Sequence, residues 1–292
     1  MSTILITGAG TGFGRESALR LAEKGHAVIA GVEIFPQIFE LQQEAKKRGV
    51  SLQVEKLDIT NEKDREKAWQ WDIDVLVNNA GVAEGGAVAD IPEKNLRHQF
   101  EVNVFGTILL TQGFAKNMAQ KKEGKIIFIS SVAGLMTDPF SGPYSASKHA
   151  LEAFATALHK ELKEFGIQVA TVNPGPYLTG FNDRMYETWK NWDDNPSTRL
   201  FDYNRLAFPH MQFDPEAVYD TVIEVVTGKS KLYRNVVPKA MKKQLQALMA
   251  AEWEATQNAD TDKRDDMVQQ AYDMKPGTPA KTFILDRILK SF

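Results

Sequence analysis

The sequence predicts an α/β fold in which a doubly wound parallel sheet carries helices on both faces. Between residue 3 and about 175, short apolar runs alternate with runs that have apolar residues at helical spacing. The short runs are rich in Val and Ile, which is typical of strands buried on both faces. A glycine-rich string, TGAGTGFG at 7–14, follows the first of them. Strands that alternate with helices build parallel sheets, so these observations together indicate this fold class.

The expected elements alternate regularly along the chain. The strands are expected at 3–7, 27–32, 52–58, 75–78, 125–130 and 168–173, around the apolar cores ILI, VIA, LQV, VLV, IIFI and VATV. The helices between them are expected at 13–24, 36–48, 61–70, 93–121 and 144–165. The last of these is typical: Leu151, Phe154, Leu158 and Leu162 recur at spacings of three and four until Gly166 ends the run.

The chain changes character after Gly175. Segment 176–210 is rich in aromatic residues without a regular apolar repeat, and we expect a loop-and-helix insertion that covers something. Beyond it we expect a helix near 215–227, a strand in KLYRNVV, a helix at about 238–257, and a polar surface segment at 258–281. The expectation is therefore one domain over 1–292, with a core of about 3–180 and a helical C-terminal extension from about 235.

The composition excludes several classes of function. The 35 Lys and Arg residues against 38 Asp and Glu give a net charge of −3, so no basic surface for nucleic acid is expected. The chain has no cysteine and its five histidines are scattered, so no metal site is expected. The longest apolar stretch, around 126–136, is broken by Ser130 and Ser131 and is too short to span a membrane. No secretory signal precedes the apolar run at Ile4, so we expect a cytoplasmic protein.

The glycine-rich string lies between an expected strand and an expected helix. Glycines there permit a tight turn and let the backbone approach a phosphate closely, and the helix N-terminus offers free N–H groups and a partial positive charge. The string therefore indicates a dinucleotide site. A glycine-rich turn without a ligand is the alternative.

The string YSASK at 144–148 places a phenol and an amine four positions apart. On a helix the two side chains lie one turn apart on the same face, and the small residues between them leave room for something flat. For an isolated pair, a surface tyrosine beside a solvated lysine is the more common explanation. Other parts of the chain must decide between the two.

The motifs together resemble those of the short-chain dehydrogenase/reductase family. Gly8, Gly12 and Gly14 have the spacing of the family's Thr-Gly-x-x-x-Gly-x-Gly pattern. Further motifs follow in the family's order: Asp58 in LDIT, NNAG at 78–81, Asn103 in VNVFG, Ser131, Tyr144 with Lys148, and NPGPYLT at 173–179. The resemblance covers about residues 3–180 and implies a Rossmann-like fold.

The resemblance implies catalytic roles for four residues. Tyr144 would be the general acid or base, and the ammonium group of Lys148, with a positively charged nicotinamide, would lower its pKa. Lys148 would also hydrogen-bond the cofactor ribose. Ser131, rather than the neighbouring Ser130, would hold the substrate oxygen and stabilise the charge that develops there. Asn103 would fix a water in the proton path behind Lys148, unless it only satisfies the helix backbone.

The resemblance also implies contacts to a nicotinamide dinucleotide. Asp58 would accept a hydrogen bond from the adenine with Ile59 beside the ring, and Pro174 and Gly175 would pass backbone groups to the nicotinamide carboxamide, with Thr179 adding a hydroxyl. The end of the fourth strand would lie against the adenosine ribose. The expected cofactor-binding residues are Gly8, Gly10, Thr11, Gly12, Phe13, Gly14, Glu33, Asp58, Ile59, Asn79, Ala80, Gly81, Tyr144, Lys148, Pro174, Gly175 and Thr179.

The end of the second strand favours NAD over NADP. Enzymes that use NAD usually place an acidic residue there, and enzymes that use NADP place a basic residue nearby. Val32 stands where the family usually has Asp, Glu33 follows it, and Thr11 rather than a basic residue precedes Gly12. A carboxylate would repel a 2′-phosphate, so NAD is expected and NADP(H) is the alternative.

The implied activity is reversible hydride transfer between NAD(H) and a secondary alcohol or ketone, as in a short-chain alcohol dehydrogenase or carbonyl reductase. The aromatic residues of 176–210 could form a lid over an apolar or ring-bearing substrate, or ordinary core, and the sequence leaves both open. A homodimer or homotetramer through 93–121 and 144–165 is expected. A non-catalytic nucleotide-sensing relative is less favoured, because such proteins typically lose the tyrosine or the lysine. Epimerases and dehydratases of the extended branch usually carry Gly-x-x-Gly-x-x-Gly, which TGAGTGFG does not fit.

Overall fold

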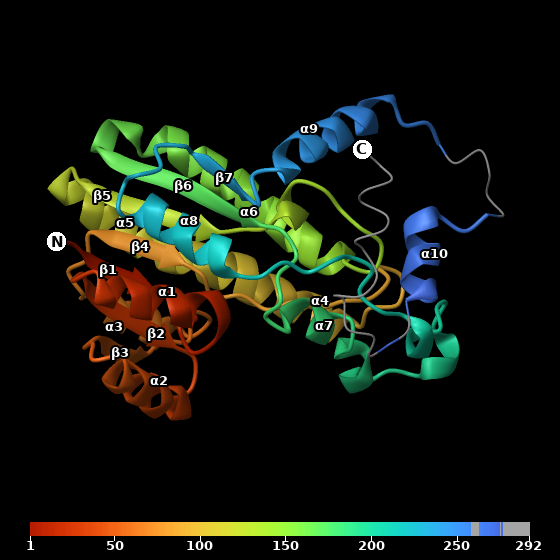
Figure 1. The fold of residues 1–292 in the computed structure, drawn as a ribbon, viewed down its shortest axis with the longest axis horizontal. Coiled ribbons are helices and arrows are strands. Elements are labelled where there is room, and N and C mark those ends of the chain that lie inside the picture. Colours follow the sequence, from red (N-terminus) through yellow and green to blue (C-terminus); the bar gives the residue numbers. More distant parts are fainter. Residues whose placement is uncertain (258–262, 275, 277–292) are drawn as a thin grey trace.

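The computed structural model describes residues 1–257, 263–274 and 276, and its centre is a seven-stranded parallel sheet (Figure 1). The strands lie in the order β3-β2-β1-β4-β5-β6-β7. Their bounds are β1 Thr3–Ile6, β2 Ala27–Val32, β3 Gln53–Lys56, β4 Val75–Asn78, β5 Gly124–Ile129, β6 Ile167–Pro174 and β7 Arg234–Val237. The doubly wound, Rossmann-like fold in a single domain is therefore confirmed.

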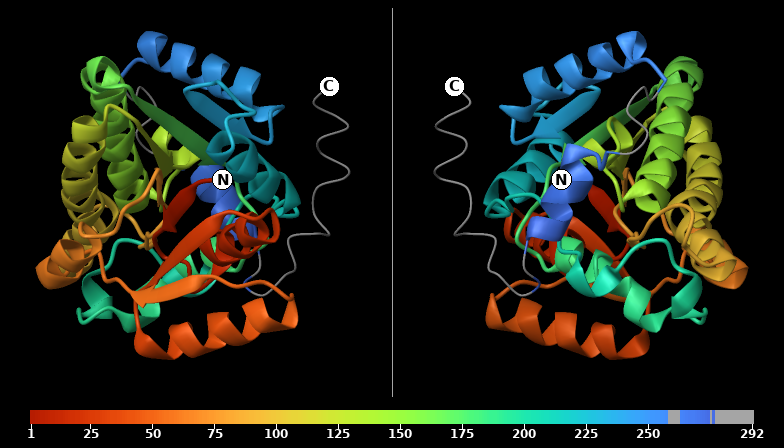
Figure 2. Two further views of the ribbon diagram at one scale, coloured as in Figure 1. Left: turned by 90° about the vertical axis from the view of Figure 1, so that its left-hand side faces the viewer. Right: turned by 90° about the vertical axis from the view of Figure 1, so that its right-hand side faces the viewer.

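Helices cover both faces of this sheet, as the two end-on views of Figure 2 show. Their bounds are α1 Gly12–Glu23, α2 Phe35–Lys47, α3 Glu62–Ala68, α4 Glu93–Phe100, α5 Thr107–Lys121, α6 Gly142–Glu161, α7 Phe181–Met185, α8 Glu216–Val226, α9 Met241–Ala251 and α10 Asp266–Asp273. Buried residues of α1, α2 and α8 join one core cluster, and those of α3, α5 and α6 join another. The two clusters are the two layers between helices and sheet.

The strands supply both layers because successive side chains of a strand point to opposite faces. Ile4 and Ile6 belong to the cluster with α1, whereas Leu5 between them belongs to the cluster with α5. Strand β5 repeats the pattern, with Ile127 in the first layer and Phe128 in the second. Burial on both faces explains why these strands read as continuous apolar runs.

The order of the strands places a crevice above β1 and β4. From β1 the chain proceeds outward to β2 and β3, and it then returns to the other side of β1, where Ile6 of β1 pairs with Val77 of β4. Connections therefore leave these two strands in opposite directions. Ligands of open α/β sheets bind at such a switch point, beyond the carboxyl ends of the strands.

Two expectations about helices need correction. The region 93–121 is not one regular helix, because a π-helical turn at Glu101–Gly106 separates α4 from α5. The wider turn is fixed by tertiary contacts: the side chain of Asn103 bonds the backbone of Val82, and a Cβ at Gly106 would lie 2.9 Å from the carbonyl oxygen of Ile59. Such turns interrupt helices mostly as single turns and often at functional sites.

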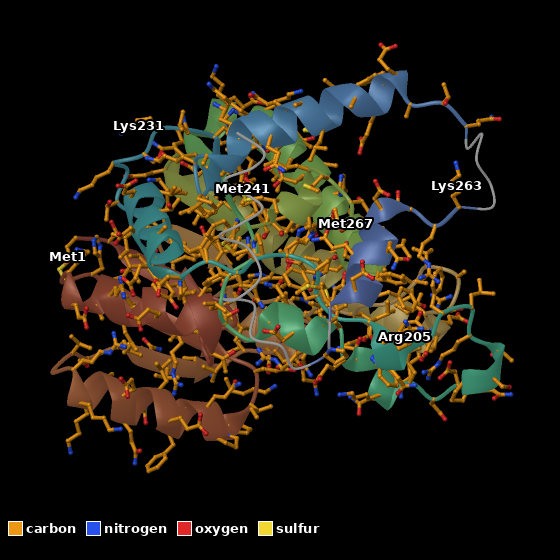
Figure 3. The ribbon with its side chains drawn as sticks, turned by 45° about the vertical axis from the view of Figure 1, so that its right-hand side comes forward. Met1, Arg205, Lys231, Met241, Lys263 and Met267 are labelled. Carbon is orange, nitrogen blue, oxygen red and sulfur yellow. The ribbon has the colours of Figure 1, made fainter. Side chains whose placement is uncertain are left out.

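The segment 258–281 is also more than a polar surface run. Part of it lies outside the described residues, but 266–273 form α10, which packs against the segment 176–210. The backbone N–H of Ala207 donates to the carbonyl oxygen of Ala271 at 3.1 Å, and Arg205 lies over the ring of Tyr272. Figure 3 shows Met267 on α10 beside the segment that carries Arg205, while Met241, at the start of α9, lies apart from both.

Within the described ranges, no helix is both long and apolar enough to cross a membrane. The same part of the chain contains no group of three or more His, Cys, Asp or Glu side chains placed to hold a metal ion.

Candidate active site

A pocket of about 320 Å³ lies at the carboxyl ends of the strands and collects the predicted site residues. Of these, only Gly14 and Asn103 do not line it. The predicted residues that line the pocket are Gly8, Gly10, Thr11, Gly12, Phe13, Glu33, Asp58, Ile59, Asn79, Ala80, Gly81, Ser131, Tyr144, Lys148, Pro174, Gly175 and Thr179. Residues from six strand ends and from the start of α6 therefore meet at one place.

The glycine turn after β1 brings its backbone close to the loop after β4 at the edge of the pocket. Gly8 has a φ of +63°, and a Cβ there would lie 2.7 Å from Cα of Ala80. At Gly14 a Cβ would lie 2.4 Å from Nδ2 of Asn79, so this glycine serves the packing of α1 on the loop after β4. The missing side chains leave the cradle that a pyrophosphate needs, and the residues present fit a dinucleotide.

Thr7 and Asn79 join the loops after β1 and β4. The Thr7 hydroxyl accepts hydrogen bonds from the backbone N–H groups of Asn79 and Ala80, each at 3.0 Å, and Asn79 Nδ2 donates to the carbonyl oxygen of Thr7 at 2.9 Å. These bonds hold the two sides of the crevice at a fixed separation. The role of Thr7 was not predicted, because its partners lie 72 and 73 positions away.

Tyr144 lies at the start of α6 and is only 9% exposed. Burial raises the pKa of its phenol to about 12, and a side-chain hydrogen bond with Ser131 acts in the opposite direction. This shift is the reverse of the expected lowering. The protein groups by themselves keep Tyr144 protonated, because desolvation of the phenolate outweighs the help from its neighbours.

Lys148 lies one turn further along α6 and is 5% exposed. Its Nζ donates to the carbonyl oxygen of Ile129 at 2.9 Å and lies 5.8 Å from the ring centroid of Tyr144. Burial lowers the pKa of Lys148 to about 8, while the negative charge of Glu152 acts to raise it. The two side chains therefore lie close together, as expected, and both are buried.

Ser131 follows β5 and faces Tyr144. Its Oγ donates to the carbonyl oxygen of Pro174 at 3.4 Å and accepts from the backbone N–H of Ala133 at 3.1 Å. The neighbouring Ser130 also lines the pocket, but its Oγ is buried without a hydrogen-bond partner. The hydrogen bond to Tyr144 favours Ser131 over Ser130 as the group that would hold a substrate oxygen.

Asn103 is fully enclosed behind the pocket. Its Oδ1 accepts from the backbone N–H of Val82 at 2.8 Å, and its Nδ2 donates to the Val82 carbonyl at 3.0 Å and to the Ser147 hydroxyl at 3.1 Å. These contacts tie the π-helical turn to the loop after β4 and to α6. The backbone that Asn103 satisfies is thus that of a neighbouring loop rather than of its own helix.

The adenosine end of the pocket lies beyond β2 and β3. Asp58 lines it, with its Oδ1 accepting from the backbone N–H of Thr60 at 2.9 Å and from the Thr60 hydroxyl at 2.7 Å. Glu33 follows β2, and its backbone N–H donates to Oε1 of Gln37 at 3.1 Å. The Lys and Arg residues among the lining residues are Lys148 and Arg184, which come from α6 and α7.

Several lining residues were not predicted. Most of them flank a motif position or belong to the irregular segment after β6, while Gln37 and His98 reach the pocket from α2 and α4. They are Gln37, Leu57, Thr60, Val82, His98, Val102, Ile129, Ser130, Tyr177, Phe181, Asn182 and Arg184. Thr60, Val82 and Ile129 stand next to motif residues in the sequence, and this position could have identified them.

The segment 176–210 covers the side of the pocket where Tyr144 lies. The ring of Phe181 meets the ring of Tyr144 edge-on, with centroids 5.8 Å apart, and Phe181 also lines the pocket. Met185, Tyr186, Trp192 and Tyr203 are buried in one cluster with Tyr144. Both interpretations of the aromatic residues thus apply, since Tyr177 and Phe181 line the pocket and Tyr186, Trp192 and Tyr203 form the core of the covering segment.

Comparison with known proteins supports what this geometry indicates. The family model described as short chain dehydrogenase matches residues 2–190. An uncharacterized oxidoreductase of Bacillus subtilis (strain 168), YusZ, is 34% identical over 236 residues, which cover 76% of this chain and 84% of that protein. An NADPH-dependent 3-dehydrocapnine reductase of Ornithobacterium rhinotracheale is 50% identical over 111 residues, which cover 37% of this chain and 39% of that protein.

A solved structure shares the fold. A short-chain dehydrogenase from Sphingobium yanoikuyae in complex with NADPH superimposes with a TM-score of 0.70 at 22% identity, covering 91% of this chain and 99% of that one. The family model extends from the glycine turn through Tyr144 and Lys148 to the covering segment, and so includes the residues that form the pocket. With these matches, the chain belongs to the short-chain dehydrogenase/reductase family of oxidoreductases.

Proposed function

We propose that this oxidoreductase transfers hydride between NAD(H) and a secondary alcohol or ketone, with Tyr144 as general acid and base. The observation that carries the proposal is that Ser131, Tyr144 and Lys148 line the same pocket as the glycine turn. A bound nicotinamide dinucleotide would supply or accept the hydride. A protein that only sensed the nucleotide would have no use for a phenol and an amine buried together at this cost.

In its protonated form, Tyr144 can act as the general acid of ketone reduction. Since burial raises its pKa to about 12, the phenol holds its proton at neutral pH and is ready to donate it to a ketone oxygen. The Ser131 hydroxyl would hold the same oxygen while negative charge develops on it. Lys148, held by the carbonyl of Ile129, would orient the ribose and keep a positive charge near the phenol.

The proposed cofactor is NAD, because Glu33 lines the pocket beyond β2 and the lining cations come from α6 and α7. The 2′-hydroxyl of NAD could donate to the carboxylate, whereas the 2′-phosphate of NADP would be repelled by it. NADP is the second candidate. The relative from Ornithobacterium rhinotracheale, 50% identical over 111 residues, is named as NADPH-dependent.

The experiment that tests the function is a panel of aliphatic and aromatic ketones assayed with NADH and with NADPH. We expect oxidation of the reduced cofactor with at least one ketone, and a kcat/KM for NADH above that for NADPH. In Glu33→Gln the preference for NADH should fall on the order of tenfold, since the hydrogen bond to the ribose is no longer made by a charged group and the 2′-phosphate is no longer repelled. Glu40→Gln, on the exposed part of α2, is the matched control and should leave the ratio unchanged. A preference for NADPH in the wild type would mean that Glu33 does not face the ribose.

The covering segment 176–210 is proposed to select the substrate. Phe181 is the aromatic residue of this segment that packs directly against Tyr144, so a substrate beside the phenol would contact an apolar ring. The buried cluster beneath it, which includes Trp192 and Tyr203, holds the segment in place. This arrangement supports an apolar or ring-bearing ketone, and the panel above distinguishes such substrates from small polar ones.

A homo-oligomer is proposed to form through α5 and α6. The π-helical turn and α6 pack side by side. Large apolar side chains are exposed on this turn (Phe105, 53%), on α5 (Leu109, 38%) and on α6 (Phe154, 43%). Apolar residues gathered on neighbouring helices mark protein interfaces. We expect light scattering to give a mass of at least two chains, and Phe105→Asp with Phe154→Asp to give the mass of one. A monomeric wild type would contradict the proposal.

A further inference from the structure

Glu152 is a buried carboxylate that the proposed reaction steps leave without a role. It lies on α6 one helical turn beyond Lys148, and only 5% of its surface is exposed. Ionised side chains at this depth are costly unless they are paired and hydrogen-bonded. The partners of Glu152 therefore show what its charge is for.

The first oxygen of Glu152 leads to Ser131. Oε1 accepts a hydrogen bond from Nδ2 of Asn173 at 2.6 Å, and the same nitrogen donates to the backbone carbonyl of Ser131 at 3.2 Å. The other side of the Asn173 amide is held too, because its Oδ1 accepts from the Thr171 hydroxyl at 2.9 Å. The orientation of Asn173 is thereby fixed, and the start of the Ser131 loop is anchored to the carboxylate.

The second oxygen of Glu152 leads outward. Oε2 accepts from a terminal guanidinium nitrogen of Arg234 on β7 at 2.8 Å. The side chain of Arg234 is 37% exposed, so this cation is solvated on its far side while the carboxylate is not. The Arg234 cation therefore balances the negative charge of Glu152 only in part. The part that is not balanced acts on the buried ammonium group of Lys148.

Packing keeps Glu152 close to the Lys148 backbone. A Cβ at Gly134 would lie 3.0 Å from the carbonyl oxygen of Lys148 and 3.1 Å from Cγ of Glu152, so the turn after β5 is pressed against this stretch of α6. Lys148 and Glu152 are each only 5% exposed, and electrostatic interactions between buried groups are stronger than in water. Consistently, the charge of Glu152 acts to raise the pKa of Lys148 against the lowering by burial.

Other charged and titratable groups surround this pair. Tyr144 and His149 belong to α6 itself, and the pKa of Tyr233, which precedes β7, is raised by burial and also by the charge of Glu152. A second cavity behind Glu152 and the main pocket in front of Lys148 add further groups. The titratable groups that share α6 or one of these cavities with the pair, or are coupled to Glu152, are Tyr144, His149, Lys160, Arg234, Glu252, Tyr233, His98, Arg184, Glu33 and Asp58.

We propose that Glu152 is a positioning residue of the reaction: its carboxylate, held by Asn173 and Arg234, keeps Lys148 positively charged and anchors the Ser131 loop beside Tyr144. The inference rests on the proposed function, in which Lys148 and Tyr144 must both carry their protons for ketone reduction. Glu152 itself touches neither the substrate nor the cofactor. It acts through Lys148 and Asn173.

The direct test measures the charge of Lys148 without any turnover. In protein labelled with ¹³C-lysine, the Cε resonance of Lys148, assigned by its loss in Lys148→Met, is followed against pH. In Glu152→Gln we expect the midpoint to fall by about one pH unit, because a nearby opposite charge is removed. In Arg234→Gln, which removes a positive charge instead, we expect the midpoint to rise. General damage to the fold would not move the two variants in opposite directions.

The kinetic test is the alkaline limb of kcat/KM for ketone reduction. Activity in this direction falls when the Tyr144–Lys148 pair loses its first proton, and removal of a negative charge makes that loss easier at either residue. The limb should therefore move to lower pH in Glu152→Gln and to higher pH in Arg234→Gln. Glu152→Asp keeps the charge and should return the limb towards the wild-type position. A purely structural role would lower kcat/KM at all pH values without moving the limb.

Glu161→Gln is the matched control, because it removes the same charge from an exposed position at the end of α6. It should move neither the NMR midpoint nor the limb. An unchanged Lys148 midpoint in Glu152→Gln would overturn the inference, and so would a fall of the midpoint in both Glu152→Gln and Arg234→Gln. If Glu152→Gln fails to fold, a fall of the midpoint in Arg234→Gln is enough to overturn it. Opposite NMR shifts in a protein that reduces no ketone would support the electrostatic inference and contradict the proposed function.

Discussion

Replacement of Tyr144 by Phe is expected to lower kcat for ketone reduction by about 10²–10⁴-fold, the range typical of a lost general acid. The variant keeps the ring, and with it the edge-on contact to Phe181, so the fold should persist. The cofactor pocket is also kept, because the ring still closes the same wall. Steady-state kinetics with the best ketone of the panel, together with fluorescence titration of NADH, measure the two effects separately.

Tyr233→Phe is the matched control for this loss. Tyr233 is also a phenol whose pKa is raised by burial, and its hydroxyl also bonds a side-chain hydroxyl, that of Thr156 at 2.9 Å. It does not line the pocket, so kcat should stay within about threefold of the wild type. Equal activity of Tyr144→Phe and wild type would refute the role assigned to Tyr144.

Replacement of Lys148 by Met is expected to lower kcat/KM on the order of 10²-fold and to raise KM for NADH, because a charge beside the reacting oxygen and a donor to the ribose are both lost. Stability should respond differently from activity. Burial lowers the pKa of Lys148 to about 8, below its ordinary value near 10.5, so the folded state binds fewer protons than the unfolded chain between these pH values. This group therefore destabilises the fold most below pH 8, and the cost is relieved as pH rises from 8 towards 10.5.

The Met variant buries no ammonium group, so it avoids this desolvation cost, but it also loses the hydrogen bond to the carbonyl of Ile129. Because the first effect is the larger, the variant should be at least as stable as the wild type at pH 7. The difference in free energy of unfolding between variant and wild type should shrink as pH rises through 8. Chemical denaturation at pH 7 and pH 9 measures it. A variant that is far less stable at pH 7 would show that Lys148 is charged at no net cost.

Lys125→Met is the matched control. Lys125 is likewise a lysine whose pKa is lowered by burial, and its Nζ donates to the carbonyl oxygens of Val225 and Val226 at the end of α8. It lies at the opposite end of β5 from the pocket, so its loss should affect stability and leave kcat/KM unchanged. If both lysine variants lost activity alike, the effect of Lys148→Met could not be ascribed to the site.

Much of the fold was predictable because its signals are local. Strands buried on both faces must be apolar throughout, and helices show their period directly, so β1 to β7 and most helices were expected near their observed bounds. The π-helical turn at Glu101–Gly106 was not predictable, because it is held by Val82 and Ile59, far away in the sequence. The helix α10 was not expected because its partner segment is far away in the sequence: Arg205 lies 67 positions before Tyr272, whose ring it covers.

The sequence by itself determined the glycine turn, the pairing of Tyr144 with Lys148 and the family to which these motifs belong, since each depends on residue type at a short spacing. Only the tertiary structure decided the direction of the Tyr144 pKa and the link from Glu152 through Asn173 to Ser131. The physical reason is desolvation. How far a phenol, an amine or a carboxylate is removed from water depends on every segment packed around it, and no spacing within one helix encodes that.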